Sequence, residues 1–251
     1  MRSLNPVWRL DDFHARIAKL ADVGPGQHVL DLGCGNGNGL GALLAAVGPT
    51  GRVTALDRDA ASLARAVEQV GPGSVTTVEA DLTAPLPFEP QSFDRVICQN
   101  VIECVADRAG LLREIHRVLR PGGSALVGHH DFDGVLLASD DKSLTRQLVQ
   151  GYADHTQDWQ DAAEGRMGRL LPGLFTGGPF ADTRTETLMF VDLTLAEGTY
   201  AHQHLGDIVR LSPHDGVPAE MAQRWLADLQ TRSNAGTFYY ALPWTYVVAS
   251  A

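Results

Sequence analysis

The sequence of 251 residues has little cysteine, no run of basic residues and no long apolar stretch. Its three cysteines lack the spacing of a metal site or a disulfide framework, which is consistent with a reducing compartment. No apolar stretch approaches the length of a membrane span, and residues 1–6 lack the apolar centre of a signal peptide. These absences predict a cytoplasmic protein that has no membrane partner.

The charge balance is acidic. Thirty Asp and Glu residues against 20 Lys and Arg residues give a formal net charge of -10, and no basic patch with interleaved aromatic residues stands out. Such a surface repels a phosphate backbone on average. The sequence therefore predicts no nucleic-acid partner, and it leaves the oligomeric state unknown.

Strand and helix patterns alternate through the first half of the chain, after an N-terminal helical segment at residues 1–26. Strands are expected at 29–32, 53–56, 75–79, 93–98 and 124–127, with helices at 40–47, 60–70 and 108–119. This βαβα order predicts an α/β fold whose parallel sheet carries helices on both faces.

The alternation ends after Asp131. Residues 132–183 hold helix-like stretches at 143–152 and 159–167 and a Gly/Pro loop at 172–179, and we expect them to form a helical cap inserted over the ligand end of the sheet. Strands at 185–195 and 245–249 and a helix at 218–231 follow. The sequence thus predicts a single domain, 1–251, that includes this cap.

The most informative segment is VLDLGCGNGNG at residues 29–39, in which a buried strand ends near Asp31 and is followed by alternating glycines. A second strand ends in Asp57, 26 residues after Asp31. At that position an acid can accept hydrogen bonds from two ribose hydroxyls. Asp31 would repel the pyrophosphate of a dinucleotide, whereas S-adenosylmethionine has a sulfonium, an ammonium and no phosphate. The segment therefore indicates a methyl donor, although residues 37–42 also fit a loose dinucleotide pattern.

Four motifs in this order resemble those of the class I S-adenosylmethionine-dependent methyltransferases, in their ubiquinone/menaquinone-biosynthesis-like branch. They lie at residues 29–37, 80–82, 93–98 and 112–123, and the resemblance covers about residues 27–131. It implies the doubly wound, seven-stranded, mostly parallel sheet of a Rossmann-like methyltransferase fold.

The resemblance also implies how S-adenosylmethionine would be held. Asp31, Gly33, Cys34 and Gly35 would line its methionine part. Asp57 would bind the ribose, while Arg58, Asp81 and Leu82 would lie at the adenine, and Gln99 and Asn100 would close over the sulfonium side. Two of these positions have a structural alternative, because Asp31 could cap a helix and Asp81 could form a turn.

His129, His130 and Asp131 end the fifth strand, beside the expected position of the transferable methyl. One histidine could act as a general base, the three could bind a metal, or they could line a substrate pocket without catalysis. Because successive strand residues point to opposite faces, convergence of both imidazoles on one metal is unfavourable, and we expect no metal.

Other polar groups have weaker functional readings. The HxH pattern of His202 and His204, followed by Asp207, could form a site, because positions 204 and 207 share a helix face, but a solvated helix explains it equally well. Trp159, Arg166 and Met167 of the cap are candidates for substrate contact.

The sequence therefore predicts an enzyme that transfers a methyl group from S-adenosylmethionine to an O, N or C atom of a small metabolite. The alternatives are an RNA or protein methyltransferase and a non-methylating S-adenosylmethionine-binding protein such as a cyclase.

Overall fold

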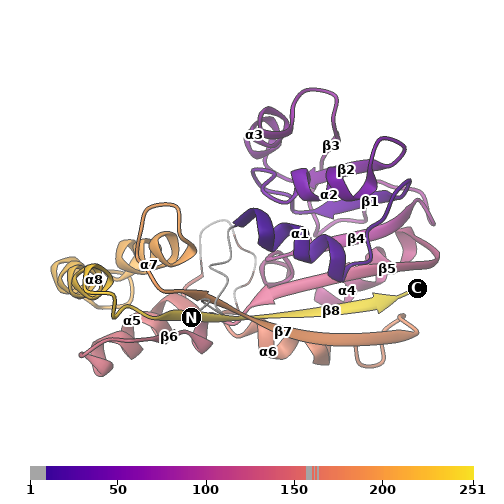
Figure 1. The fold of residues 1–251 in the computed structure, drawn as a ribbon. Helices are drawn as coiled ribbons and strands as arrows, with labels where there is room; N and C mark the ends of the chain where they lie inside the picture. Colours follow the sequence, from indigo (N-terminus) through magenta and orange to yellow (C-terminus); the bar gives the residue numbers. More distant parts are fainter. Residues whose placement is uncertain (1–9, 157–159, 161, 163) are drawn as a thin grey trace, which may run out of the picture. The chain divides into compact units, whose positions relative to one another are not determined.

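A computed structural model describes residues 10–156, 160, 162 and 164–251 of the chain (Figure 1). They fall into two compact units. The sheet unit comprises Asp11–His129, Arg169–Glu186 and Thr245–Ala251, and the second unit comprises Leu10, His130–Gly168 and Thr187–Trp244. The segment 132–183, expected as one cap, therefore contributes to both units, and its role as a cap stays a prediction.

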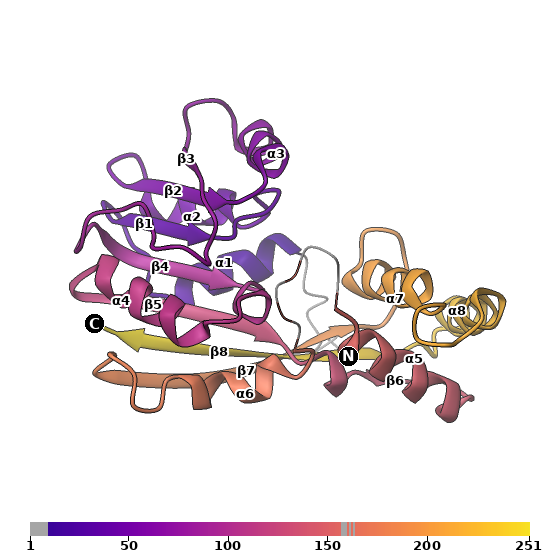
Figure 2. The ribbon, with the colours of Figure 1, turned by 180° about the vertical axis from the view of Figure 1, so that it is seen from behind.

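The sheet unit begins with helix α1 (Leu10–Leu20) and then alternates strands with helices, as expected. Its strands are β1 (His28–Leu32), β2 (Arg52–Asp57), β3 (Thr76–Glu79), β4 (Phe93–Gln99) and β5 (Leu119–His130), the last residue of which belongs to the second unit. Its helices are α2 (Leu40–Val47), α3 (Ala60–Val70), the 3₁₀ turn η1 (Ile102–Cys104) and α4 (Arg108–Val118). Opposite views show α2 on one face of these strands and α4 on the other (Figures 1 and 2).

The remaining elements include α5 (Lys142–Asp154), α7 (Tyr200–Leu211) and α8 (Ala219–Asn234) of the second unit, with the short η2 (Phe132–Gly134) and β6 (Leu136–Leu137). Helix α6 (Met167–Leu174) and strands β7 (Asp182–Asp192) and β8 (Tyr240–Ser250) have residues in both units. None of the described helices is both long and apolar enough to cross a membrane.

The strand order is β3-β2-β1-β4-β5-β8-β6, with β7 also paired to β8. β1 is parallel to β2 and β4, and β3 and β5 extend the parallel run on either side. The fold class is thus confirmed. The described residues form eight strands rather than seven, because β6 adds a two-residue antiparallel pairing with Tyr240–Ala241 that is too short to leave a sequence signal.

The parallel register brings the carboxyl ends of the central strands to one edge. Leu32 of β1 pairs with Leu56 of β2 and with Cys98 of β4, so the residues that follow these three strands emerge together. Three of the five β1 residues, Val29, Leu30 and Leu32, are fully buried. Burial of apolar strands on both faces is what a sheet covered by helices requires. The carboxyl edge of such a sheet is where open α/β folds generally bind ligands.

Several expected boundaries differ from the observed ones. β5 begins at Leu119 instead of residue 124, since the Pro-Gly-Gly segment lies within the strand, where the register with β4 shifts between Phe93 and Arg95. Helix α6 runs through Pro172, where a loop was expected. Residues 159, 161 and 163 of the helix-like stretch expected at 159–167 lie outside the described residues.

Candidate active site

The glycine turn after β1 is held against β2 through its backbone. The N–H groups of Gly33 and Cys34 both donate to the carbonyl of Leu56, at 2.8 and 3.0 Å. Gly33 has a φ of +68°, and a Cβ there would lie 2.3 Å from a methyl of Val101. Both the left-handed backbone and the close approach require glycine at this position. A Cβ built on Gly35 meets nothing within 4 Å, so this part of the turn has open space beside it.

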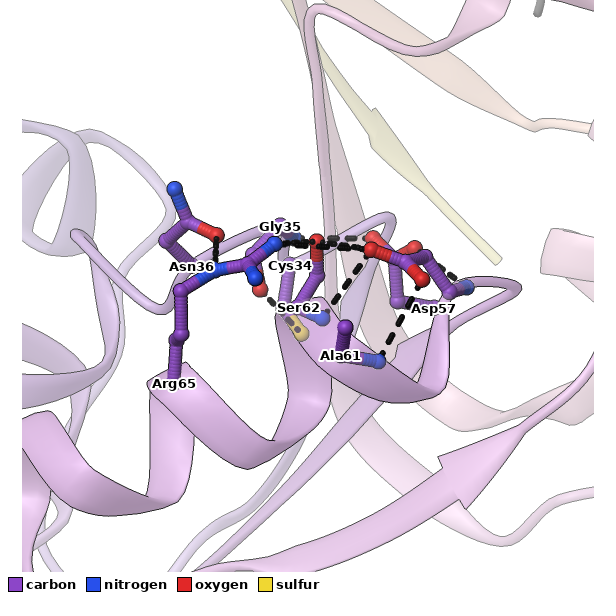
Figure 3. A network of polar contacts seen from close by, with 8 residues as sticks. Cys34, Gly35, Asn36, Asp57, Ala61, Ser62 and Arg65 are labelled. Atoms are coloured by element: carbon purple, nitrogen blue, oxygen red, sulfur yellow. Dashed lines mark hydrogen bonds and ion pairs between the residues drawn. The ribbon is translucent and has the colours of Figure 1, made fainter.

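Asp57 closes the turn from the end of β2. Its two carboxylate oxygens accept from the N–H of Gly35 at 2.8 Å and from the N–H of Asp59 at 3.0 Å (Figure 3). A carboxylate has about four lone-pair sites, so these two bonds leave acceptor capacity for a ligand. The neighbouring Arg65 of α3 donates to Asn36 at 2.7 Å and so ties the turn to that helix (Figure 3).

Asp31 is buried directly before the turn, with 7% of its surface exposed. Burial, together with the nearby Asp57 carboxylate, raises the pKa of its carboxyl from 3.8 to about 7. The expected alternative of a helix cap does not describe it, since Asp31 lies within strand β1. A buried carboxyl group that faces another carboxylate is suited to a cationic ligand, because positive charge stabilises its ionised form.

The expected adenine-side residues emerge after β2 and β3. Asp81 is exposed and accepts from the backbone N–H and the hydroxyl of Thr83, at 2.9 and 2.8 Å, which lowers its pKa. The turn expected as an alternative for Asp81 is therefore present. Arg58 is near enough to lower the same pKa, so the structure brings these two residues together, with the half-buried Leu82 next in the chain.

Cys34 lies half-buried in the turn, with its sulfur 3.6 Å from the carbonyl oxygen of Gly35. Burial is the main cause that raises the pKa of its thiol to about 12, with the Asp31 and Asp57 carboxylates adding to it. The thiol is therefore protonated at neutral pH and is not an activated nucleophile.

Gln99 and Asn100 follow at the end of β4. Asn100 has a φ of +55°, which is uncommon for a residue other than glycine, and its N–H donates to the carbonyl of Gly128 at 2.9 Å. The side-chain oxygen of Asn100 is buried without a hydrogen-bond partner among the described residues. A buried polar atom of this kind is costly unless a ligand or water satisfies it.

His129 contacts Glu103 of η1 through its Nε2 atom and the Oε2 atom of the carboxylate. His129 is fully buried, and Glu103 is 8% exposed. Burial raises the pKa of Glu103 to about 7. Sequence reasoning missed Glu103, although an acid inside the otherwise apolar segment Val101–Val105 was a usable signal.

His130 belongs to the second unit and has different neighbours. Its ring centroid lies 3.7 Å from that of Trp244, 4.9 Å from that of Phe132 and 5.2 Å from that of Tyr200. The two histidines thus contact different side chains, as alternation along a strand requires. No group of three or more potential metal ligands occurs within the part of the chain that the structure describes.

The same aromatic cluster contains His204, and here the expectation of a solvated helix was wrong. His204 is only 3% exposed, its Nδ1 atom lies 2.6 Å from the hydroxyl of Tyr240, and burial lowers its pKa to about 3. Asp207 instead accepts from Arg210. Helix α7 packs this face on the second unit's core, which the isolated HxH pattern did not indicate.

Of the three cap residues that were candidates for substrate contact, Trp159 lies outside the described residues. Arg166 is paired with Glu164 at 2.9 Å, and Met167 is fully buried. Contact of Arg166 with a substrate therefore stays a prediction, whereas Met167 is packed in the core.

Comparison with known proteins agrees with this geometry. Residues 30–127 match the family model Methyltransf_11, described as a methyltransferase domain. An uncharacterized 37.1 kDa protein in transposon TN4556 of Streptomyces fradiae is 34% identical over 92% of this chain and 64% of its own length. A demethylmenaquinone methyltransferase of Staphylococcus aureus is 39% identical over 47% of this chain and 46% of its own length. The chain thus spans about half to two thirds of these relatives.

Among solved structures, the YcgJ protein of Bacillus subtilis covers 94% of this chain and 97% of its own, with a TM-score of 0.61 and 17% identity. The fold and the glycine turn thus define a Rossmann-like methyltransferase domain. Residues 30–127 thus match a methyltransferase domain family, and a demethylmenaquinone methyltransferase is among the relatives of this segment.

Proposed function

We propose that this protein transfers a methyl group from S-adenosylmethionine to an O, N or C atom of a small metabolite. The observation that carries the proposal is the buried Asp31 carboxyl beside the glycine turn, with Asp57 at the end of the next strand. This arrangement would repel a pyrophosphate and attract a sulfonium or ammonium group. The unpartnered oxygen of Asn100 adds a second polar group that a ligand would satisfy.

The residues present fit this cofactor. Asp31, Gly33, Cys34 and Gly35 would surround its methionine part, and Asp57 would accept from the ribose hydroxyls. Arg58, Asp81 and Leu82 would lie at the adenine, and Gln99 and Asn100 at the sulfonium side. When bound, S-adenosylmethionine supplies a methyl group that is already activated for in-line displacement, so the protein mainly has to align the acceptor and exclude water.

A base is needed only if the acceptor must lose a proton. We assign this role to His129 rather than His130, because His129 contacts a carboxylate whereas His130 packs among aromatic rings. A neutral imidazole can take a proton near neutral pH, and a carboxylate partner orients it for that task.

A small acceptor is supported by the acidic composition, which disfavours RNA, and by a relative whose name states that it methylates demethylmenaquinone. An RNA or protein acceptor and a non-methylating role remain as outcomes of the test below.

The test has two stages. Titration calorimetry should show binding of S-adenosylmethionine and S-adenosylhomocysteine and no binding of NAD, and tighter binding of NAD would contradict the proposal. The protein is then incubated with methyl-labelled S-adenosylmethionine and a metabolite extract, and mass spectrometry identifies which compound gains the label. A label found only in RNA or protein would replace the acceptor class, and cofactor binding without S-adenosylhomocysteine formation would indicate a non-methylating protein.

A further inference from the structure

The Glu103–His129 contact is connected to the candidate active site on both sides, at the glycine turn and at Asn100, within the sheet unit. Val101, two residues before Glu103, packs against Gly33 of the glycine turn. On the other side, the carbonyl of Gly128, which precedes His129, accepts the N–H of Asn100 at 2.9 Å. The pair therefore lies on the segments that build the candidate active site.

We propose that Glu103 is a positioning residue that holds the His129 imidazole and sets its proton affinity, so that the two side chains together accept the proton released by the methyl acceptor. This inference rests on the proposed function, since a proton has to be accepted only if an acceptor is methylated. It adds a residue and a proton route to that function.

The chemistry of the contact fixes the state of the imidazole. When Glu103 is ionised, its carboxylate oxygen can only accept a hydrogen bond, so the facing Nε2 atom of His129 then carries the proton and Nδ1 is the basic nitrogen. Both side chains are almost completely buried, which makes a separated charge on either one costly. Uptake of one proton turns a buried negative pair into a neutral one, and burial therefore favours that uptake.

Further polar groups lie around the pair. The Cys104 sulfur lies 3.7 Å from Oε1 of Glu103. Arg108 of α4 donates to the carbonyls of Ile102 and Glu103, each at 3.3 Å, and opposes the rise in the pKa of Glu103 that burial causes. Tyr246 of β8 lies against Gly128. With the burial included, the pKa of Glu103 is about 7, so the pair can exchange a proton near neutral pH.

The proposed step is balanced. An acceptor hydroxyl loses its proton to the pair while its oxygen forms a bond to the methyl carbon. The bond between that carbon and sulfur breaks, and its electrons remain on sulfur, which gives neutral S-adenosylhomocysteine. The proton then leaves the pair to solvent after product release.

The decisive variant is Glu103→Gln, which keeps the shape of the side chain and removes its charge. Loss of the carboxylate lowers the proton affinity of His129, so we expect the acid limb of the rate profile to move to lower pH by about one unit or more. kcat should fall about 10- to 100-fold, with little change in KM. Glu103→Asp retains a carboxylate and should restore part of both effects, which a purely structural role would not require.

Two exposed positions provide matched controls, Glu68→Gln on α3 and His202→Gln on α7. Both should keep the wild-type rate and pH profile. If Glu103→Gln does not fold, judged by its thermal transition, the same comparison is made between Glu103→Asp and the wild type.

A second readout separates this inference from the proposed function. The ring nitrogens of His129 are followed by ¹⁵N NMR in the ligand-free protein, with assignment from His129→Gln. A titration of His129 that is the same in wild type and Glu103→Gln would overturn the pairing, whatever the activity. A titration that moves to lower pH in a protein that methylates nothing would keep the pairing and overturn the proposed function alone.

Discussion

Replacing Asp31 by asparagine should make the ligand-free protein more stable and at the same time weaken its binding of S-adenosylmethionine. The substitution preserves the shape of the side chain and removes a carboxyl that is 7% exposed. The causes that raise its pKa are burial and the Asp57 carboxylate. In the absence of a ligand, ionised Asp31 therefore destabilises the fold.

The magnitude follows from the raised pKa. The folded protein binds a proton on Asp31 up to a pH of about 7, whereas the unfolded chain releases it near 3.8. The contribution of Asp31 to the free energy of unfolding is thus most favourable below pH 3.8, falls as the pH rises between these values, and levels off above 7. A difference of about three units corresponds to about 4 kcal/mol at pH 8. We expect Asp31→Asn to recover about 1–4 kcal/mol of this, less where the new amide is not hydrogen-bonded.

Binding should change in the opposite direction. A cationic ligand requires ionised Asp31, about 90% populated at pH 8 and about 10% at pH 6 for a pKa of about 7. The wild-type Kd for S-adenosylmethionine should therefore rise about tenfold between pH 8 and pH 6. Asp31→Asn should bind more weakly than the wild type at pH 8, and without this pH dependence.

The assays are urea unfolding at pH 8 and pH 5 and calorimetric titration at pH 6, 7 and 8. The stability gain of the variant should shrink by about 2–3 kcal/mol at pH 5, where the wild-type carboxyl is already protonated. Asp182→Asn, at an exposed position, is the control and should change neither quantity. An Asp31→Asn protein that is no more stable at pH 8, and that binds the cofactor as tightly as the wild type, would refute the reasoning.

Two further predictions concern Asp57 and Gly33 of the site, and a third concerns residues 132–183. Asp57→Ala should lose charge-assisted hydrogen bonds to two ribose hydroxyls, which contribute about 1.5–3 kcal/mol each. The loss is measured as weaker cofactor affinity, and an unchanged Kd would show that Asp57 does not belong to the site. Gly33→Ala should destabilise the protein by about 1–3 kcal/mol and abolish cofactor binding, because the φ of residue 33 is +68° and the new methyl would overlap Val101. Urea unfolding measures the stability and calorimetric titration the binding. Wild-type stability together with wild-type affinity would contradict this account of the turn. Hydrogen exchange in residues 132–183 should slow when cofactor and acceptor bind together, as expected for a closing cap. Equal exchange rates with and without these ligands would indicate a rigid insertion.

The sequence alone predicted the α/β fold and the cofactor end of the site. Strand periodicity and glycine requirements act over a few neighbouring residues, so VLDLGCG already specified a buried strand followed by a tight turn. Asp31 and Asp57 could be placed together because the carboxyl ends of parallel strands meet at one edge, which the βαβ order dictates.

Only the tertiary structure decided the partners of the buried polar groups. Helix α4 and most of strand β5 separate Glu103 from His129 along the chain. No local sequence pattern predicts that η1 contacts the end of β5. The HxH pattern at His204 fits a solvated helix as well as a packed one, and the core that α7 joins determined its burial. A side chain's pKa and hydrogen-bond partner depend on which distant segments exclude water from it, and that information is absent from short-range spacing.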